Sequence, residues 1–282
     1  MPYQLVEDAF GDPRNAAALA AASQFAYYPE DQGAEAFRDE LGLTARLVSA
    51  NNTQAYVAED DANILVAFRG SEGPTSVDGL KDWFLTNAMN LLVQPTGPLA
   101  TEFLGAGVGA RWHMGFVAAI TDIWPPLYAD VSAKLAAKER PLWVTGHSLG
   151  GALALMASWL LFRKTVMPHQ IVTFGGPMVG NKIVAEAFDR EFAGKLFRYV
   201  NAPDPVPLLP MMSVTSNEFA HGEKLMILGD SAQAADLIAY LRTSAGDAAS
   251  AVVSGQVAEK LWEVVKGRIA AHLLTDYRKL IG

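Results

Sequence analysis

The chain of 282 residues contains no cysteine, which excludes disulfide bonds and thiolate metal sites. It has no cluster of lysine and arginine interleaved with aromatic residues, so we expect no nucleic-acid partner. Its longest apolar run, residues 149–162, is shorter than the roughly 18 residues that a membrane-spanning helix needs, so we expect no transmembrane segment. No group of histidines and carboxylates has metal-site spacing, and no phosphate-binding glycine motif occurs. We therefore expect neither a metal nor a cofactor.

The first eight residues also lack the basic and apolar stretches of a secretory signal peptide. This predicts a cytoplasmic protein, and the alternative is a secreted protein whose leader has been removed. The net charge of −8 arises in residues 1–61, which hold eleven acidic and three basic residues, against nineteen of each in residues 62–282. Such a segment is typical of a solvated face, and strong attraction to an anionic bilayer is not expected.

What the chain does contain is hydrophobic residues, 51% of the total, enough to bury a large core in one domain spanning residues 1–282. Strand-like runs alternate with helical patterns. The expected strands are residues 45–50, 53–58, 63–68, 142–144, 171–174 and 196–201, with a short one within 214–228, and the expected helices are 15–27, 33–41, one opening at 113–116, one from 151 onward, 183–192, 235–242 and 256–269. This alternation predicts an α/β fold with a mostly parallel central sheet flanked by helices.

The centre of the chain is the G-x-S-x-G motif Gly146-His147-Ser148-Leu149-Gly150. It joins a short apolar strand to a helix that is apolar on every face and hence buried. A turn this tight has no room for side chains two residues before and two after the serine, and both positions are glycine. The turn would hold the Ser148 hydroxyl clear of the backbone at a helix N-terminus, which favours a nucleophile over a structural turn.

A serine hydroxyl needs a neighbouring imidazole to accept its proton, and that imidazole needs a carboxylate to fix its tautomer. Where a G-x-S-x-G turn between a strand and a helix supplies the nucleophile, the acid and the histidine follow it in the order Ser, Asp or Glu, His, and Ser148, Asp204 and His272 have this order. Asp204 lies in a proline-bounded loop after a strand. By contrast, Asp189 falls within an amphipathic helix and Asp276 is typical of a solvated charge, so we favour Asp204.

Five blocks of sequence, in the same order along the chain, resemble the class 3 lipases of the α/β-hydrolase fold. They are residues 66–71 with Asp82-Trp83, 113–116, 146–154, 173–181 and 198–210. The resemblance implies the catalytic residues Ser148, Asp204 and His272. It also implies an oxyanion hole made by the backbone N–H of Ser71, helped by its hydroxyl, and by the backbone N–H of Leu149.

Two histidines, His221 and His272, follow Asp204 in the sequence and are candidates for the base. His272 with Tyr277 is similar to the terminal histidine and following tyrosine of the family, although Ala271 stands where many members have aspartate. His221 lies in a stretch that resembles a structural segment of the family, so we favour His272. The alternative is that residues 269–271 continue a helix through a buried, structural His272. The remaining histidines, His113, His147 and His169, fit structural or solvated roles.

These features together predict a serine carboxylic-ester hydrolase, a lipase that hydrolyses acylglycerols through an acyl-enzyme on Ser148. The alternatives are a phospholipase A1, a short-chain or feruloyl-type esterase, or a silent member that binds a lipid or a protein. A lipase implies a lipid or small ester substrate and transient contact with a lipid–water interface. The segment that matches the lid of the family, Glu72–Leu80, has only Val77 and Leu80 as apolar residues, which predicts modest interfacial activation.

Overall fold

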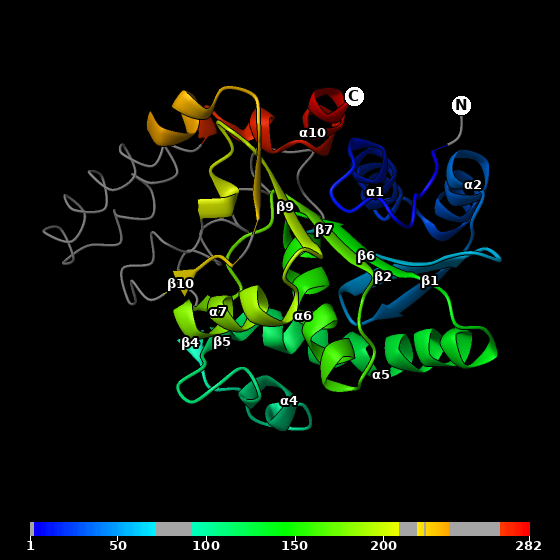
Figure 1. Cartoon of the computed structure of the whole chain (residues 1–282), viewed down its shortest axis with the longest axis horizontal. Coiled ribbons are helices and arrows are strands. Elements are labelled where there is room, and N and C mark those ends of the chain that lie inside the picture. The colour runs from blue at the N-terminus through cyan, green and yellow to red at the C-terminus, as the bar shows by residue number, and fades with distance from the viewer. Residues whose placement is uncertain (1–2, 72–91, 209–218, 223, 237–265) are drawn as a thin grey trace, which may run out of the picture.

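The structure of the chain is a computed structural model that describes residues 3–71, 92–208, 219–222, 224–236 and 266–282 (Figure 1). The predictions for Glu72–Leu80 and Asp82-Trp83 lie outside the described residues. Most of the two helices expected at 235–242 and 256–269 lies outside them as well.

A seven-stranded sheet forms the centre of this described part, in the order β1-β2-β3-β6-β7-β9-β11. The strands are β1 (Thr44–Ala50), β2 (Thr53–Glu59), β3 (Ile64–Phe68), β6 (Leu142–His147), β7 (Gln170–Phe174), β9 (Leu196–Asn201) and β11 (Leu225–Leu228). The pairs β1–β2 and β2–β3 are antiparallel, and every neighbouring pair from β3 to β11 is parallel. The expectation of a mostly parallel central sheet is confirmed.

Helices cover both faces of this sheet (Figure 1). On one face lie α1 (Pro13–Phe25), α2 (Glu30–Leu41) and α10 (Leu274–Ile281), and on the other lie α5 (Met114–Ala137) and α6 (Leu149–Arg163). Alternate residues of each strand enter two separate cores: Val66 and Val144 pack with α5 and α6, whereas Ala67 and Trp143 pack with α1 and α2. The strands are apolar along their length because both faces are buried.

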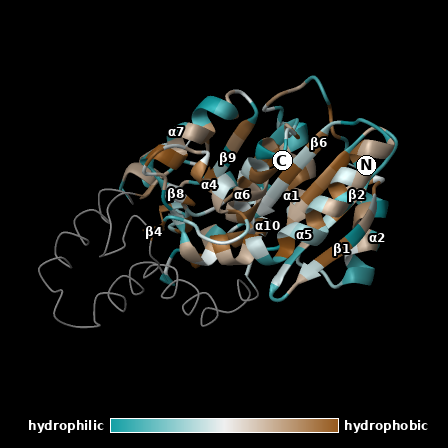
Figure 2. Cartoon of the chain, turned by 90° about the horizontal axis from the view of Figure 1, so that it is seen from below, coloured by the Kyte–Doolittle hydropathy of each residue, from teal (hydrophilic) through white to brown (hydrophobic). Residues whose placement is uncertain are grey.

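Helix α6 is apolar on every side because it is enclosed on every side. It contacts β3, β6 and β7 on one side and α4 (Ala100–Leu104) and α5 on the other. Figure 2 shows the strands of the sheet largely in the hydrophobic colour, while the outer surface of α2 is hydrophilic. Among the described residues, no helix combines the length and the apolar character needed to cross a bilayer.

A smaller sheet lies beside α7 (Lys182–Glu191), in the order β10-β8-β5-β4. Its strands are β4 (Leu92–Val93), β5 (Trp112–His113), β8 (Gly180–Asn181) and β10 (Phe219–Ala220). Residues 92–111, whose sequence has no clear helix or strand pattern, thus hold the strand β4 and the short helix α4. His113 ends β5 and caps α5, since its Nδ1 accepts a hydrogen bond from the backbone N–H of Phe116 at 3.3 Å.

Helix α1 ends two residues earlier than its sequence pattern predicts, at Phe25 and not at Tyr27. The reason is Pro29, which disfavours helical geometry at the residue before it and so stops the helix nearby. Tyr27 consequently lies in a turn at the end of α1, and its phenol extends toward the end of β6, where it contacts His147.

Candidate active site

The Ser148 motif forms a sharp turn between the central strand and the buried helix. Strand β6 ends at His147 and α6 begins at Leu149, so Ser148 is the only residue between them. Its backbone has φ 57° and ψ −130°, a conformation that residues with a side chain rarely adopt. The turn stays in place because the Ser148 N–H donates to the carbonyl of Phe174 on β7 at 2.9 Å.

The two glycines of the motif are needed for different reasons. A side chain at Gly146 would collide with the carbonyl oxygen of Gly150 across the turn. A side chain at Gly150 would collide with the carbonyl oxygen of Phe68, the last residue of β3. The second glycine thus allows the end of β3 to lie directly against the start of α6.

Asp204 and His272 form a buried pair although 68 residues separate them. Asp204 follows β9 in a turn closed by its own N–H, which donates to the carbonyl of Asn201 at 2.8 Å. Its Oδ1 accepts from the N–H of Val206 at 2.9 Å, and its Oδ2 accepts from Nδ1 of His272 at 2.8 Å. Asp204 and His272 are each 1% exposed, so the carboxylate fixes the imidazole tautomer away from water.

The His272 ring is arranged as a base would be. Because Nδ1 carries the proton donated to Asp204, Nε2 has a lone pair, and this buried atom has no hydrogen-bond partner within the described residues. His272 ends a short 3-10 helix, Ile269–His272, and is not continuous with a longer helix. The side-chain amide of Asn201 donates to the carbonyl of Ala271 at 2.8 Å and so ties this segment to the end of β9.

Tyr277 is a further member of the site that the sequence pattern did not single out for a role. Its hydroxyl donates to Oδ2 of Asp204 at 2.5 Å, the same oxygen that His272 contacts. Burial, together with the Asp204 charge and this bond, raises the pKa of Tyr277 well above its ordinary value. Gly175 has a left-handed backbone, φ 58°, and a side chain there would lie 2.9 Å from both Asp204 Oδ2 and the Tyr277 hydroxyl.

The two expected oxyanion donors lie at the same edge of the sheet. Phe68 on β3 is opposite Gly146 on β6, so the segment leading to Ser71 leaves the sheet beside the Ser148 turn. Leu149 opens α6, and the first N–H groups of a helix have no carbonyl partner within it. The Oγ of Ser71 is buried without a hydrogen-bond partner in the described residues. The end of β3 and the start of α6 therefore adjoin at this edge, since a side chain at Gly150 would collide with the carbonyl oxygen of Phe68.

His221, the competing candidate for the base, is occupied elsewhere. Its Nε2 donates to the carbonyl oxygen of Pro207. Burial lowers the pKa of His221 well below its ordinary value, and the charge of Arg198 lowers it further. His169 is also engaged, since its Nε2 donates to the carbonyl of Glu7 at 2.7 Å.

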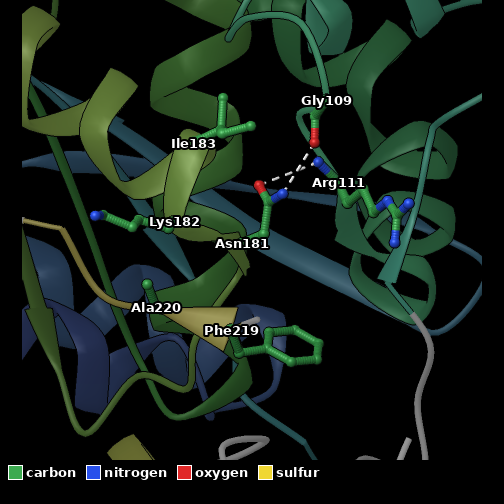
Figure 3. Close-up of a pocket in the computed structure, with 7 residues that line it drawn as sticks. All are labelled: Gly109, Arg111, Asn181, Lys182, Ile183, Phe219 and Ala220. Atoms are coloured by element: carbon green, nitrogen blue, oxygen red, sulfur yellow. Dashed lines mark hydrogen bonds between the residues drawn. The ribbon is translucent and has the colours of Figure 1, made fainter. Parts of the chain in front are cut away.

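A shallow cavity of about 540 Å³ lies between the small sheet and α7, apart from the residues just described. It is lined by Gly109, Arg111, Asn181, Lys182, Ile183, Phe219 and Ala220. The Asn181 side chain joins its walls, donating to the carbonyl of Gly109 at 2.9 Å and accepting from the N–H of Arg111 at 3.2 Å (Figure 3). The Arg111 and Lys182 side chains point in different directions, so they do not form a common anion site.

A serine turn at the carboxyl end of a parallel sheet, with an acid and a histidine supplied by later segments, defines the α/β-hydrolase class. Solved structures of fungal lipases share this fold. A mutant form of MDLA from Penicillium cyclopium aligns over 76% of this chain and 77% of its own, with a TM-score of 0.58 and 22% identity. The native Rhizomucor miehei lipase propeptide complex aligns over 79% of this chain and 71% of its own, with a TM-score of 0.59 and 23% identity.

Within the α/β-hydrolase class, the sequence identifies the family. The family model described as Lipase (class 3) matches residues 65–214, just over half of the chain, and the chain belongs to this family.

Curated relatives match the same region. A secreted mono- and diacylglycerol lipase 1 from Fusarium solani is 37% identical over 159 residues, which cover 55% of this chain and 42% of that protein. A secreted mono- and diacylglycerol lipase 3 from Gibberella zeae is 33% identical over 136 residues, 45% of this chain and 40% of that protein. A chloroplastic phospholipase A(1) DAD1 from Arabidopsis thaliana is 26% identical over 166 residues, 55% of this chain and 35% of that protein. The matched part of the chain spans less than half the length of these relatives.

Proposed function

We propose that this chain is a serine carboxylic-ester hydrolase, a lipase that cleaves acylglycerols through an acyl-enzyme on Ser148. The observation that carries the proposal is that the strained Ser148 turn adjoins the buried Asp204–His272 pair, since His147 Nε2, in the residue before Ser148, lies 2.8 Å from the His272 carbonyl oxygen. The relatives from Fusarium solani and Gibberella zeae, both named as mono- and diacylglycerol lipases, support acylglycerols as the substrate class.

In the proposed first half-reaction, Ser148 Oγ attacks the ester carbonyl carbon while His272 Nε2 takes the hydroxyl proton. The positive charge formed on His272 is stabilised by Asp204 through the Nδ1–H bond of 2.8 Å. The backbone N–H groups of Ser71 and Leu149 donate to the carbonyl oxygen as it becomes negative. The C–O bond to the alcohol then breaks, and the alcohol leaves with the proton from His272.

The second half-reaction repeats these steps with water. His272 Nε2 takes a proton from a water molecule, which attacks the acyl-enzyme carbonyl, and the fatty acid leaves as Ser148 regains its proton. The sum is one ester and one water converted to one acid and one alcohol. No metal and no cofactor is needed for these steps.

Covalent labelling tests the nucleophile. A fluorophosphonate should label the wild-type protein, and Ser148→Ala should lose both labelling and hydrolysis, with turnover lower by roughly a millionfold. A matched control is Ser158→Ala, because Ser158 is equally buried in α6 but only donates to the carbonyl of Ala154 at 2.7 Å. Labelling that persists in Ser148→Ala would contradict the assignment.

The substrate class is tested with matched emulsions of mono-, di- and triacylglycerol, a phosphatidylcholine emulsion, and p-nitrophenyl esters of increasing chain length. We expect the highest kcat/KM on acylglycerols. The second candidate function is that of a phospholipase A1, which the similarity to the Arabidopsis enzyme supports, and a clear preference for phosphatidylcholine would establish it. Activity confined to short, soluble esters would indicate an esterase.

We propose secretion as the location of the protein. The relatives from Fusarium solani and Gibberella zeae are named as secreted lipases, and they give no support to the cytoplasmic location expected from the first eight residues. Comparing the esterase activity of culture medium and cell extract from the source organism distinguishes the two. Activity only in the extract would return the assignment to the cytoplasm.

A further inference from the structure

The histidine next to the nucleophile is held at both ring nitrogens. His147 is 1% exposed, and its Nε2 lies 2.8 Å from the backbone carbonyl oxygen of His272. Its Nδ1 lies 2.9 Å from the hydroxyl oxygen of Tyr27. A carbonyl oxygen only accepts hydrogen bonds, so Nε2 carries the proton, and Nδ1 of the neutral ring accepts from Tyr27.

The surroundings of His147 favour this neutral state. Burial lowers the pKa of His147 well below its ordinary value, and the neighbouring His272 lowers it further. The two histidine rings lie with their centroids 4.6 Å apart. A neutral ring with one fixed tautomer can therefore bridge a tyrosine on one side and the backbone of the proposed base on the other.

Tyr27 in turn contacts the segment that bears the proposed oxyanion donor. A side chain at Gly70 would collide with the Tyr27 hydroxyl and would lie 2.8 Å from the carbonyl oxygen of His147. Burial raises the pKa of Tyr27 above its ordinary value, and Arg69 and the backbone N–H of Gly70 oppose that rise. Tyr27 therefore lies between Gly70, which directly precedes Ser71, and His147, which directly precedes Ser148.

We infer that Tyr27 and His147 are positioning residues for the reaction proposed above, on which this inference rests. Tyr27 holds the His147 ring through Nδ1 and packs against Gly70 after β3, and His147 holds the backbone of His272 through Nε2. Tyr27 lies outside residues 65–214, the region that the family model matches.

The contact between His147 and His272 matters because it joins the base to the strand of the nucleophile. The other described anchors of this segment run to β9 and the turn after it: Asn201 donates to the carbonyl of Ala271, and His272 donates to Asp204. The His147 bond instead ties the His272 backbone to the end of β6, at the residue next to Ser148. Displacing a catalytic group by about 1 Å can lower a rate by roughly a hundredfold, so loss of this bond should slow the chemical step.

The test uses the full chain with three substitutions and one control. Tyr27→Phe removes the hydroxyl only, and His147→Phe removes both ring nitrogens. His147→Gln keeps an amide N–H that can donate to the His272 carbonyl. The control is Tyr56→Phe, because Tyr56 is a buried tyrosine on the α1 face of the sheet whose hydroxyl donates to the carbonyl of Tyr28 at 3.2 Å and not to His147.

Steady-state kinetics on a soluble p-nitrophenyl ester should separate positioning from binding and from stability. We expect kcat to fall roughly a hundredfold in His147→Phe and roughly tenfold in Tyr27→Phe, with KM changed less than about twofold. The kcat of His147→Gln should be about tenfold higher than that of His147→Phe, and Tyr56→Phe should keep the wild-type kcat. All assays are run well below the melting temperature of each variant.

A second readout does not depend on turnover. The proton on His272 Nδ1 that is shared with Asp204 should give a downfield proton NMR resonance, sharp in the wild type and in Tyr56→Phe. It should broaden or move in His147→Phe and return in His147→Gln. If all three variants keep the wild-type kcat and this resonance, the inference is overturned even where melting temperatures fall. Failure of the proposed function is seen separately, as hydrolysis that survives in Ser148→Ala.

Discussion

Replacing Tyr277 with phenylalanine tests how much the tyrosine hydroxyl contributes to the carboxylate at the centre of the site. The hydroxyl donates to Asp204 Oδ2 at 2.5 Å, and the ring packs edge-on against Phe174 with centroids 6.4 Å apart. Tyr277→Phe keeps the ring and its packing and removes the hydroxyl alone. The change therefore isolates one hydrogen bond to a buried carboxylate.

The expected magnitude follows from the partners that remain. A hydrogen bond to a charged group contributes about 1.5–3 kcal/mol, and Asp204 keeps the N–H of Val206 and Nδ1 of His272 as donors, so it is not left unpaired. We expect a loss of about 2 kcal/mol in the free energy of unfolding, or about 3–4 °C in melting temperature for a chain of 282 residues. Because the Asp204–His272 bond survives, kcat should fall less than about tenfold.

Thermal melts and kinetics on the same preparations check this, with Tyr56→Phe as the reference for an ordinary buried hydroxyl. The Tyr56 bond goes to a neutral carbonyl at 3.2 Å, so its loss should be about 1 kcal/mol. An unchanged melting temperature in Tyr277→Phe would refute the charge-assisted bond. A fall in kcat of a hundredfold or more would show that Tyr277 orients Asp204 for catalysis and does not only stabilise it.

Three further predictions concern the donors and bases of the site. Ser71→Ala keeps the backbone N–H and loses the hydroxyl, so kcat should fall roughly tenfold to a thousandfold with little change in KM, and an unchanged rate would place Ser71 outside the oxyanion hole. His272→Ala should lose about as much activity as Ser148→Ala, whereas His221→Ala should mainly lower the melting temperature; a dead His221→Ala with an active His272→Ala would reverse the assignment. Because the folded pKa values of His147 and His221 are lowered, below about pH 6.5 the unfolded chain binds protons that the folded chain does not. The free energy of unfolding should therefore be level above that pH and should fall below it by up to about 1.4 kcal/mol per pH unit for each histidine. Urea unfolding at pH 7.5 and at pH 5.5 measures this difference. Equal free energies of unfolding at the two pH values would contradict the prediction.

The sequence pattern predicts those parts of the site that depend on local geometry. The Ser148 turn could be predicted because Gly146 and Gly150 are needed within the same few residues, and the sheet because its strands are short, continuous apolar runs. Asp204 could be placed because it directly follows one of these runs. The end of α1 was predicted two residues too late because the helical pattern outweighed the effect of Pro29.

The contacts that depend on tertiary packing could not be predicted. Tyr27 meets His147 across 120 residues, and Tyr277 meets Asp204 across 73, so no periodicity or motif links them. The preference for His272 over His221 rested on the family resemblance and not on a local pattern, since both histidines follow Asp204 in the sequence. In the structure the segment after residue 268 lies against the end of β9, and this position brings His272 to Asp204.

The packing of α1 against α10 has a consequence for when the proposed active site is complete during folding. Segments near residue 20 and near residue 275 lie side by side (Figure 1), and Arg278 donates to the hydroxyl of Tyr3 at 3.0 Å. Contacts between such distant parts of a chain form late, because a long loop must close before they contribute. The sheet and the Ser148 turn can therefore form before α1 packs against α10. We therefore expect the site proposed above to be complete only after the segment from residue 269 onward has packed, because that segment brings His272 and Tyr277 to Asp204.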